Sequence, residues 1–572
     1  MKFYKQLPFL AAFTMLLFLV SCSKTNKQGK LIPNNAGMVI HLNGQSLSAK
    51  LPWDEIKANP LFQEMHADSS VPSFAKNIFD NPENSGIDVK GDLIFFSQQD
   101  SLGSIMAFEG SIKDAAKFKA FNKDVTKGGS ETEQNGIHFI SHSPVCVGWK
   151  EDRFVYVFNS PHFRYPGKIP DFGMTVTPVS RDILKACKDI FDLQEKNSLG
   201  SNEKFTELMK KNGDIHFWIN SEELNKSFTG AAMGPLSMMN ISKLYEGSVT
   251  VATLNFENGK IAVDFKSYAG KLLKDLLKKY SGGSINEDMI KRIPAKDVAA
   301  LFALNFKPEG IKELLKTLGM DGLANMGLST MGITLDDFIK ANKGDILFAV
   351  TDLKAKKDTT TINANGAPTI HADLFPQAGF LFAASIGDKE SFNKLIAVGK
   401  KLMSPKMGDS DSAASFSLFP KLAYNTNADY FAIGNSKENI DKYVGTGTSN
   451  SFDFISKLSG KPFGGYVNIQ YIMKAMETDL TKDSSSKIGF DASLKMWDNM
   501  YMTGGKYDDG GISYNMEINL VDKSTNSLKQ LNQYLGKLSY LAKERKKHHE
   551  MMEEMFKVAD SIAVPKKPAD EK

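Results

Sequence analysis

The sequence predicts an α+β fold made of two tandem, diverged copies of an antiparallel sheet covered by helices, followed by a long C-terminal amphipathic helix. Three observations predict it: alternating apolar strands separated by capped helices, the same order of motifs in both halves, and a leucine repeat at helical spacing near the end of the chain. Strands that alternate between apolar and polar residues bury one face, as in an antiparallel sheet covered by helices on one side.

The first element is an export signal in residues 1–21. Lys2 and Lys5 supply positive charge, and residues 7–20 form an almost wholly apolar run, too short to span a hydrocarbon core of about 30 Å. The run ends in Leu-Val-Ser before Cys22, the pattern of a lipobox. We therefore expect cleavage before Cys22 and acylation of its thiol, which anchors the chain to the lipid bilayer. The alternative is an ordinary signal peptide that happens to contain a cysteine.

Residues 22–30 are polar and basic, and we interpret them as a flexible tether. The Ser-Cys-Ser-Lys junction resembles lipoproteins of the Bacteroidota. In that group, acidic residues after the lipidated cysteine are associated with surface display. The basic tether therefore favours a cell-envelope lipoprotein of the outer membrane that faces the periplasm.

Size and charge restrict the partners. The mature chain keeps about 550 residues, too many for a single core, so two or more domains are expected. The full sequence has a net charge of +4, and the mature chain about +2 because Lys2 and Lys5 are removed; so small a charge argues against nucleic acid as a partner. Cys146 lies in a strand pattern and Cys187 in a helical one, and whether they pair in an oxidising compartment stays open.

The motifs of residues 31–280 recur in the same order in residues 293–525, which indicates an old duplication. Residues 281–292 between them begin with Ser-Gly-Gly-Ser and are read as a linker. The matched pairs are Ile32-Pro33 with Ile293-Pro294, Lys90-Gly91-Asp92 with Lys343-Gly344-Asp345, Phe108 with Phe382, the helix-capping Asp114 with Asp388, and the hairpin turns at Asn258-Gly259 with Asp509-Gly510.

The last part of the chain differs from both copies. Four leucines at 3-4-3 spacing predict an amphipathic helix over residues 526–560, and residues 561–572 form a charged tail without a core pattern. The leucines are Leu528, Leu531, Leu535 and Leu538.

At its start the chain resembles a known family. Ile32-Pro33 is followed by Leu42-Asn43-Gly44 and then by Leu51-Pro52-Trp53, and with the Lys-Gly-Asp strand starts these motifs are similar to DUF4836, an uncharacterised lipoprotein family of the Bacteroidota. The resemblance covers most of the mature chain. It implies no activity, because the shared motifs are structural.

No catalytic arrangement emerges. Gly445-Thr446-Gly447 lacks the third glycine and the preceding strand of a dinucleotide site, and the helix containing His548-His549 lacks the second histidine that zinc proteases need at i+4. Four histidines fall in strand patterns of the first half and are read as structural: His41, His138, His142 and His216. We therefore predict a protein that is not an enzyme, with no cofactor and no metal site.

Two segments rich in methionine and glycine suggest an adaptable apolar binding surface; helix packing against the sheet is the favoured alternative. Their methionines are Met233, Met238, Met239, Met320, Met326 and Met331. The leading hypothesis is a membrane-anchored, non-catalytic envelope lipoprotein that binds or scaffolds another envelope component. The alternatives are an apolar-ligand or lipid-binding protein and a hydrolase with an unrecognised site.

Overall fold

The computed structural model describes residues 28–67, 73–100, 103–126, 128–160, 181–228, 242–354, 359–362, 368–371, 377–403, 422–445, 449–481 and 484–539. The chain forms two compact units, Met1–Gly44 with Pro82–Leu224 and Gln45–Asn81 with Asn225–Lys572. The units do not coincide with the two predicted copies, because residues 225–280 belong to the second unit.

The first unit contains an antiparallel sheet with the spatial order β8–β1–β2–β3–β7–β6–β5–β4. Its strands are β1 (Ala36–Asn43), β2 (Asp92–Asp100), β3 (Gly103–Ser111), β4 (Ser130–Gln134), β5 (Ile137–His142), β6 (Val145–Lys150), β7 (Arg153–Ser160) and β8 (Ile215–Asn220). The four histidines of the first half that fall in strand patterns lie in these strands, as predicted.

Helices cover both faces of this sheet, which corrects the expectation of one covered face. Phe118 on α6 packs edge-on against Trp149, whereas Phe205 on α8 packs against Trp218 on the opposite face. The helices are η1 (Pro82–Ser85), α6 (Ala115–Val125), α7 (Ile183–Phe191), η2 (Glu195–Asn197), η3 (Leu199–Ser201), α8 (Glu203–Lys210) and α9 (Ser221–Phe228), the last of which runs into the second unit.

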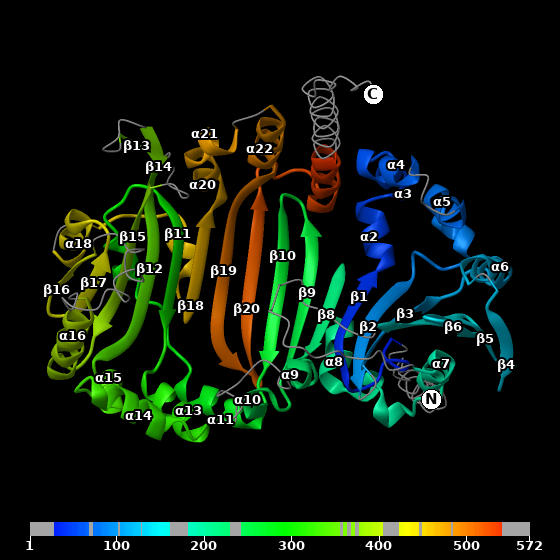
Figure 1. Ribbon diagram of the computed structural model, residues 1–572, viewed down its shortest axis with the longest axis horizontal. Coiled ribbons are helices and arrows are strands. Elements are labelled where there is room, and N and C mark those ends of the chain that lie inside the picture. Colours follow the sequence, from blue (N-terminus) through cyan, green and yellow to red (C-terminus); the bar gives the residue numbers. More distant parts are fainter. Residues whose placement is uncertain are drawn as a thin grey trace, which may run out of the picture. The chain divides into compact units, whose positions relative to one another are not determined.

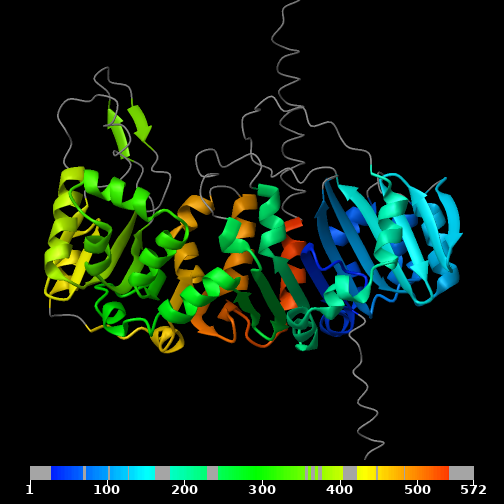
Figure 2. The same cartoon turned by 90° about the horizontal axis from the view of Figure 1, so that it is seen from below.

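The second unit contains an antiparallel sheet with the order β9–β10–β20–β19–β18–β11–β12–β15–β17–β16 (Figure 1). Its strands are β9 (Val249–Glu257), β10 (Lys260–Tyr268), β11 (Val298–Asn305), β12 (Asn342–Lys354), β15 (Gln377–Ile386), β16 (Ala423–Thr426), β17 (Tyr430–Gly434), β18 (Phe463–Asn468), β19 (Trp497–Asp508) and β20 (Gly511–Leu520). A separate hairpin of β13 (Thr359–Ile362) and β14 (Pro368–His371) projects away from this sheet (Figure 2).

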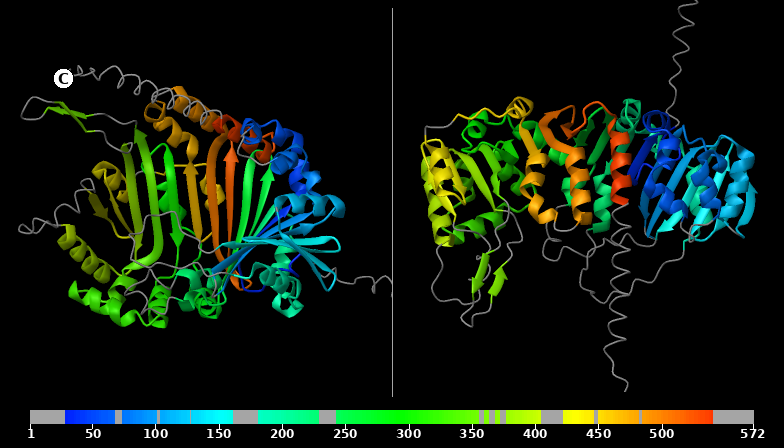
Figure 3. Two further views of the ribbon diagram at one scale, coloured as in Figure 1. Left: turned by 45° about the vertical axis from the view of Figure 1, so that its right-hand side comes forward. Right: turned by 90° about the horizontal axis from the view of Figure 1, so that it is seen from above.

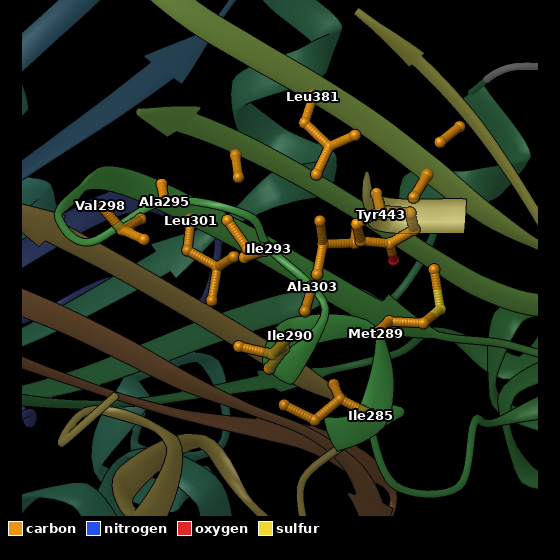
Figure 4. Close-up of a cluster of buried hydrophobic side chains, with 14 of the residues drawn as sticks. Ile285, Met289, Ile290, Ile293, Ala295, Val298, Leu301, Ala303, Leu381 and Tyr443 are labelled. Carbon is orange, nitrogen blue, oxygen red and sulfur yellow. The ribbon is translucent and has the colours of Figure 1, made fainter. Parts of the chain in front are cut away.

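The core of the second unit lies on one face of this sheet. Strand residues such as Leu301, Leu347 and Leu381 meet Met289 and Ile290 of α12 and Tyr443 of α18 there (Figure 4). The helices of the unit are α2 (Gly44–Lys50), α3 (Trp53–Lys57), α4 (Pro60–Ala67), α5 (Ser73–Asp80), α10 (Ser242–Tyr245), α11 (Lys271–Tyr280), α12 (Glu287–Lys291), α13 (Glu309–Thr317), α14 (Asp321–Thr330), α15 (Leu335–Lys340), α16 (Lys389–Met403), α18 (Lys437–Val444), α19 (Ile455–Leu458), α20 (Ile469–Ala475), α21 (Glu477–Leu480) and α22 (Ser484–Met496).

Local sequence signals explain where elements begin and turn. Asp114 caps α6 by accepting a hydrogen bond from the Lys117 amide, and Asp388 accepts one from the Ser391 amide at the start of α16; both caps were predicted. β18 ends at Asn468, where α20 begins, and α22 runs directly into β19. The helices α20, α21 and α22 therefore lie together at that end of the strands (Figure 3).

The two predicted closing hairpins are confirmed. β9 pairs with β10 across the Asn258-Gly259 turn, and β19 pairs with β20 across the Asp509-Gly510 turn. Residues 527–539 are helical. The remainder of the helix predicted over residues 526–560 lies outside the described residues.

Candidate functional site

Aromatic side chains form a row on the second sheet, on the face opposite the buried core. Phe302 on β11 pairs across the ladder with Phe348 on β12, which pairs with Phe382 on β15. Phe463 on β18 lies 5.3 Å from Phe302 and 6.0 Å from Tyr514 on β20, measured between ring centroids. We call these five residues the second aromatic stripe.

This stripe is open in mid-strand. Phe302 and Phe348 are 40% and 41% exposed, whereas Leu301 and Leu347, their neighbours on the other face, are 3% and 1% exposed. Successive side chains of a strand point to opposite faces. The same strands therefore bury one apolar face and leave the other partly uncovered, and contiguous exposed apolar surface of this kind marks binding sites.

The first sheet carries a similar row, which we call the first aromatic stripe: Phe95, Met106, Phe108, Tyr156 and Phe158. Phe95 stacks on Phe108 with ring centroids 4.5 Å apart, Phe108 lies 6.0 Å from Tyr156, and Tyr156 lies 6.2 Å from Phe158. Helix α6 covers the Tyr156 end. Phe95, Met106 and Phe158 remain 41%, 43% and 38% exposed.

The second Met/Gly segment lies at the surface. Met326 on α14 is 62% exposed, Met331 is also exposed, and Met320 is half-buried. α14 packs against α13 and α15 and buries none of its own residues. Met326 and Met331 are thus surface residues, whereas the alternative of helix packing against the sheet predicts buried methionines. Met233, Met238 and Met239 of the first segment lie outside the described residues.

A buried polar chain in the first unit was not foreseen as a connected group. Nδ1 of His41 lies 2.9 Å from Nδ1 of His216, and Nε2 of His41 lies 2.9 Å from Oδ1 of Asp92. Nε2 of His216 lies 3.1 Å from the carbonyl oxygen of Lys211, and Gln28 donates to the other oxygen of Asp92. His41 and His216 face each other because they are directly paired on β1 and β8.

The hydrogen-bond partners assign the protons of this chain. A carbonyl oxygen can only accept, so His216 carries its hydrogen on Nε2 and its neutral ring accepts at Nδ1. His41 then donates from Nδ1 to His216, and its Nε2 faces the carboxylate of Asp92.

The pKa shifts agree with this assignment. Burial lowers the pKa of His216 to about 4, and the charge on His41 acts in the same direction. Burial alone would raise the pKa of Asp92, but hydrogen bonds from His41 and Gln28 outweigh burial and hold it below its ordinary value.

A second buried pair lies in the same sheet. Glu109 on β3 is fully buried and accepts a hydrogen bond of 3.1 Å from Nη2 of Arg153 on β7. Burial raises the pKa of Glu109 against the opposing charge of Arg153. Its other oxygen, Oε1, has no hydrogen-bond partner among the described residues.

A family model for a domain of unknown function, DUF4836, matches residues 29–369. The chain belongs to the DUF4836 family. Two crystal forms of TP0453 resemble it with TM-scores of 0.25, at 11% and 10% sequence identity; the matches cover 44% and 45% of this chain and 83% and 87% of TP0453. So low a score supports no functional inference. A comparison with curated proteins finds no match.

The structure describes some of the other residues that the sequence of this DUF4836 protein singles out. Cys22 lies outside the described residues. Cys146 and Cys187 are both buried and reduced. Within the described part of the chain, no group of three histidine, cysteine or acidic residues could hold a metal ion. None of the described helices has the length and apolar character needed to cross a bilayer.

Sequence reasoning missed the aromatic stripes, although a signal was present. Val298–Leu304 is apolar at every position, so the second face of β11 is apolar as well as the first. Catalytic motifs consist of polar groups, so an apolar strand does not stand out as a site. Which side chains line up across β11, β12 and β15 depends on their register, which was not predicted.

Proposed function

We propose that this DUF4836 protein is an exported, lipid-anchored envelope protein that binds an apolar ligand without catalysing a reaction. The observation that carries the proposal is the exposure of Phe302 and Phe348 in the middle of otherwise well-packed strands. The lipobox at Cys22 supports the envelope location, and the basic tether supports the periplasmic side of the outer membrane.

A slender apolar chain, such as an acyl chain, is the class of ligand that fits this surface best. The second stripe runs from β15 across β12, β11, β18 and β19 to β20, a length of roughly 24 Å at the usual strand spacing. A stable protein partner covers about 800 Å² on each side, and the few half-exposed rings of each stripe offer less than that. Apolar lining with few polar groups is also typical of small-ligand sites.

The non-catalytic part of the proposal rests on how the described titratable groups are used. His41 and Asp92 are bound to each other, His216 is held neutral, and Glu109 is paired with Arg153. A hydrolase would need a nucleophile beside an accessible base. These groups instead make hydrogen bonds to one another within the sheet of the first unit.

Ligand binding can be tested with the mature chain and a fluorescent fatty acid. The variant Phe302→Thr/Phe348→Thr introduces β-branched residues, which favour strands, and should weaken binding by roughly tenfold, because covering the two exposed rings contributes on the order of 1.4 kcal/mol. Val521→Thr is the matched control, since Val521 is 45% exposed outside both stripes.

Equal affinity in the stripe variant and the wild type would rule out the second aromatic stripe as the binding site. The variant Met326→Gln distinguishes binding at this stripe from binding at α14. If it alone abolishes binding, the ligand lies on α14, as the Met/Gly hypothesis holds, and the stripe proposal fails.

We also propose that the two halves arose by duplication, as their ladders suggest. β1 lies between β2 and β8, and β11 lies between β12 and β18. Asn43 pairs with Asp92 and Asn305 with Asp345, and both ladders have an irregularity near the start of the first strand. Phe95 pairs with Phe108 just as Phe348 pairs with Phe382.

The closing hairpins support this proposal independently, because they pair with each other as the two copies of a symmetric dimer would. β10 and β20 are antiparallel, with Lys260 opposite Asn519 and its counterpart Gly511 opposite Tyr268. The Leu520 amide donates to the Gly259 carbonyl, and the Ala269 amide donates to the Gly510 carbonyl at the equivalent place.

A further inference from the structure

The first unit brings the two cysteines that follow Cys22 together from separate elements. Cys146 lies on β6. Cys187 lies on α7, where it shares the buried face with Ile183 and Ile190. The helix starts at Asp182, whose side chain accepts a hydrogen bond from the Lys185 amide, and it packs against β6 and β7. Both cysteine side chains are fully buried.

The contacts of Cys187 place its sulfur beside Cys146. Sγ of Cys187 lies 3.9 Å from the carbonyl oxygen of Val155, and Val155 is directly opposite Gly148 on β6. A Cβ atom at Gly148 would lie 3.0 Å from this sulfur. Cys146 stands two residues before Gly148 and so projects from the same face, and each thiol shifts the pKa of the other, as close neighbours do.

We infer that Cys146 and Cys187 form an intramolecular disulfide in the exported protein. The inference rests on the export part of the proposed function, since structural disulfides persist in oxidising compartments. The bond would tie α7 to the sheet at the position where Gly148 leaves room for the second sulfur.

The reaction balances by thiol–disulfide exchange with an oxidant that is itself a disulfide, either a small molecule or an oxidised dithiol protein. The thiolate of one cysteine attacks the oxidant and releases one thiol. The thiolate of the other cysteine then attacks the first cysteine's sulfur in the mixed disulfide and releases the second thiol. The oxidant gains two electrons, and the two cysteine protons end on its thiols. Because both sulfurs are buried in the folded unit, exchange takes place before α7 docks.

The test uses the full chain from two sources. Protein exported with its own signal is denatured in N-ethylmaleimide and analysed by mass spectrometry. The expected result is no alkylation at Cys146 or Cys187 and a linked peptide pair that reduction separates. In parallel, a chain lacking residues 1–21 and carrying Cys22→Ser is made in the cytosol, unfolded, and refolded with reduced and oxidised glutathione, where the same pair should form.

The two experiments distinguish a failure of the disulfide inference from a failure of the export proposal. A refolded chain that regains its secondary structure yet keeps two free thiols would overturn the geometric basis of the disulfide. A disulfide that forms in vitro but is absent from protein whose signal has been removed would overturn the inference for the cell. Failure of signal removal would instead refute the export proposal, which the mass of the N-terminal peptide reports separately. The single variants Cys146→Ser and Cys187→Ser control for pairing between chains.

Discussion

His216, which faces His41 across the β1–β8 ladder, makes the stability of the fold depend on pH. His216 must stay neutral to accept the hydrogen bond from His41 while it donates to Lys211. Its folded pKa is about 4, below the value of 6.5 for an unperturbed histidine. Between pH 4 and pH 6.5 the unfolded chain binds a proton at His216 that the folded chain does not bind. Lowering the pH in this range therefore reduces the free energy of unfolding.

Stability should therefore fall as the pH drops from 6.5 to 4, with a slope of at most about 1.4 kcal/mol per pH unit from this group. Urea unfolding of the wild type and of His216→Gln between pH 7 and pH 4 checks this. Glutamine can accept and donate hydrogen bonds at the same place without titrating. The stability of the His216→Gln variant should therefore depend less on pH than that of the wild type. Identical profiles for the two proteins would contradict the role of His216.

At the scale of elements, the two closing hairpins offer a matched comparison. Gly259 and Gly510 both have positive φ, at 68° and 76°, a conformation that suits glycine. A Cβ atom at Gly259 would lie 2.5 Å from the Cα of Lys523, whereas one at Gly510 would meet only the Lys274 side chain at 4.0 Å. The first turn is thus packed against backbone, and the second is open.

Gly510→Ala should cost about 1–2 kcal/mol of unfolding free energy, from the left-handed conformation alone. Gly259→Ala should cost more than about 3 kcal/mol, because the backbone around Lys523 must also move. Denaturant unfolding of both variants measures the difference. Equal losses would show that the contact between this turn and residue 523 is not tight.

At the scale of the whole molecule, the anchor decides where the protein is held. Cys22→Ala removes the thiol that receives the lipid, so the protein should leave the membrane fraction or accumulate as uncleaved precursor. Palmitate labelling and fractionation measure both outcomes, with Cys187→Ser as a control that keeps the lipobox. Label that persists in Cys22→Ala would rule out this anchor.

Local signals were sufficient for many elements, because caps and tight turns depend on a few neighbouring residues. Asp114 and Asp388 cap the predicted helices, and the Asn-Gly and Asp-Gly turns close the predicted hairpins. The sequence assigns β9 and β10 to the first copy, whereas the structure places them in the second compact unit. The pairing of β10 with β20 joins residues some 250 positions apart, and no local pattern reports such a contact.

The sequence by itself determined membership of the DUF4836 family, a mixture of helices with antiparallel strands, and several capping and turn residues, because these depend on short motifs and on periodicity. Only the tertiary structure decided which residues meet. Strand register places Phe302 beside Phe348 and His41 beside His216, and the docking of α7 sets Cys187 over Gly148. Register and docking follow from packing across the sheet, in which each position is chosen jointly by partners distant along the chain.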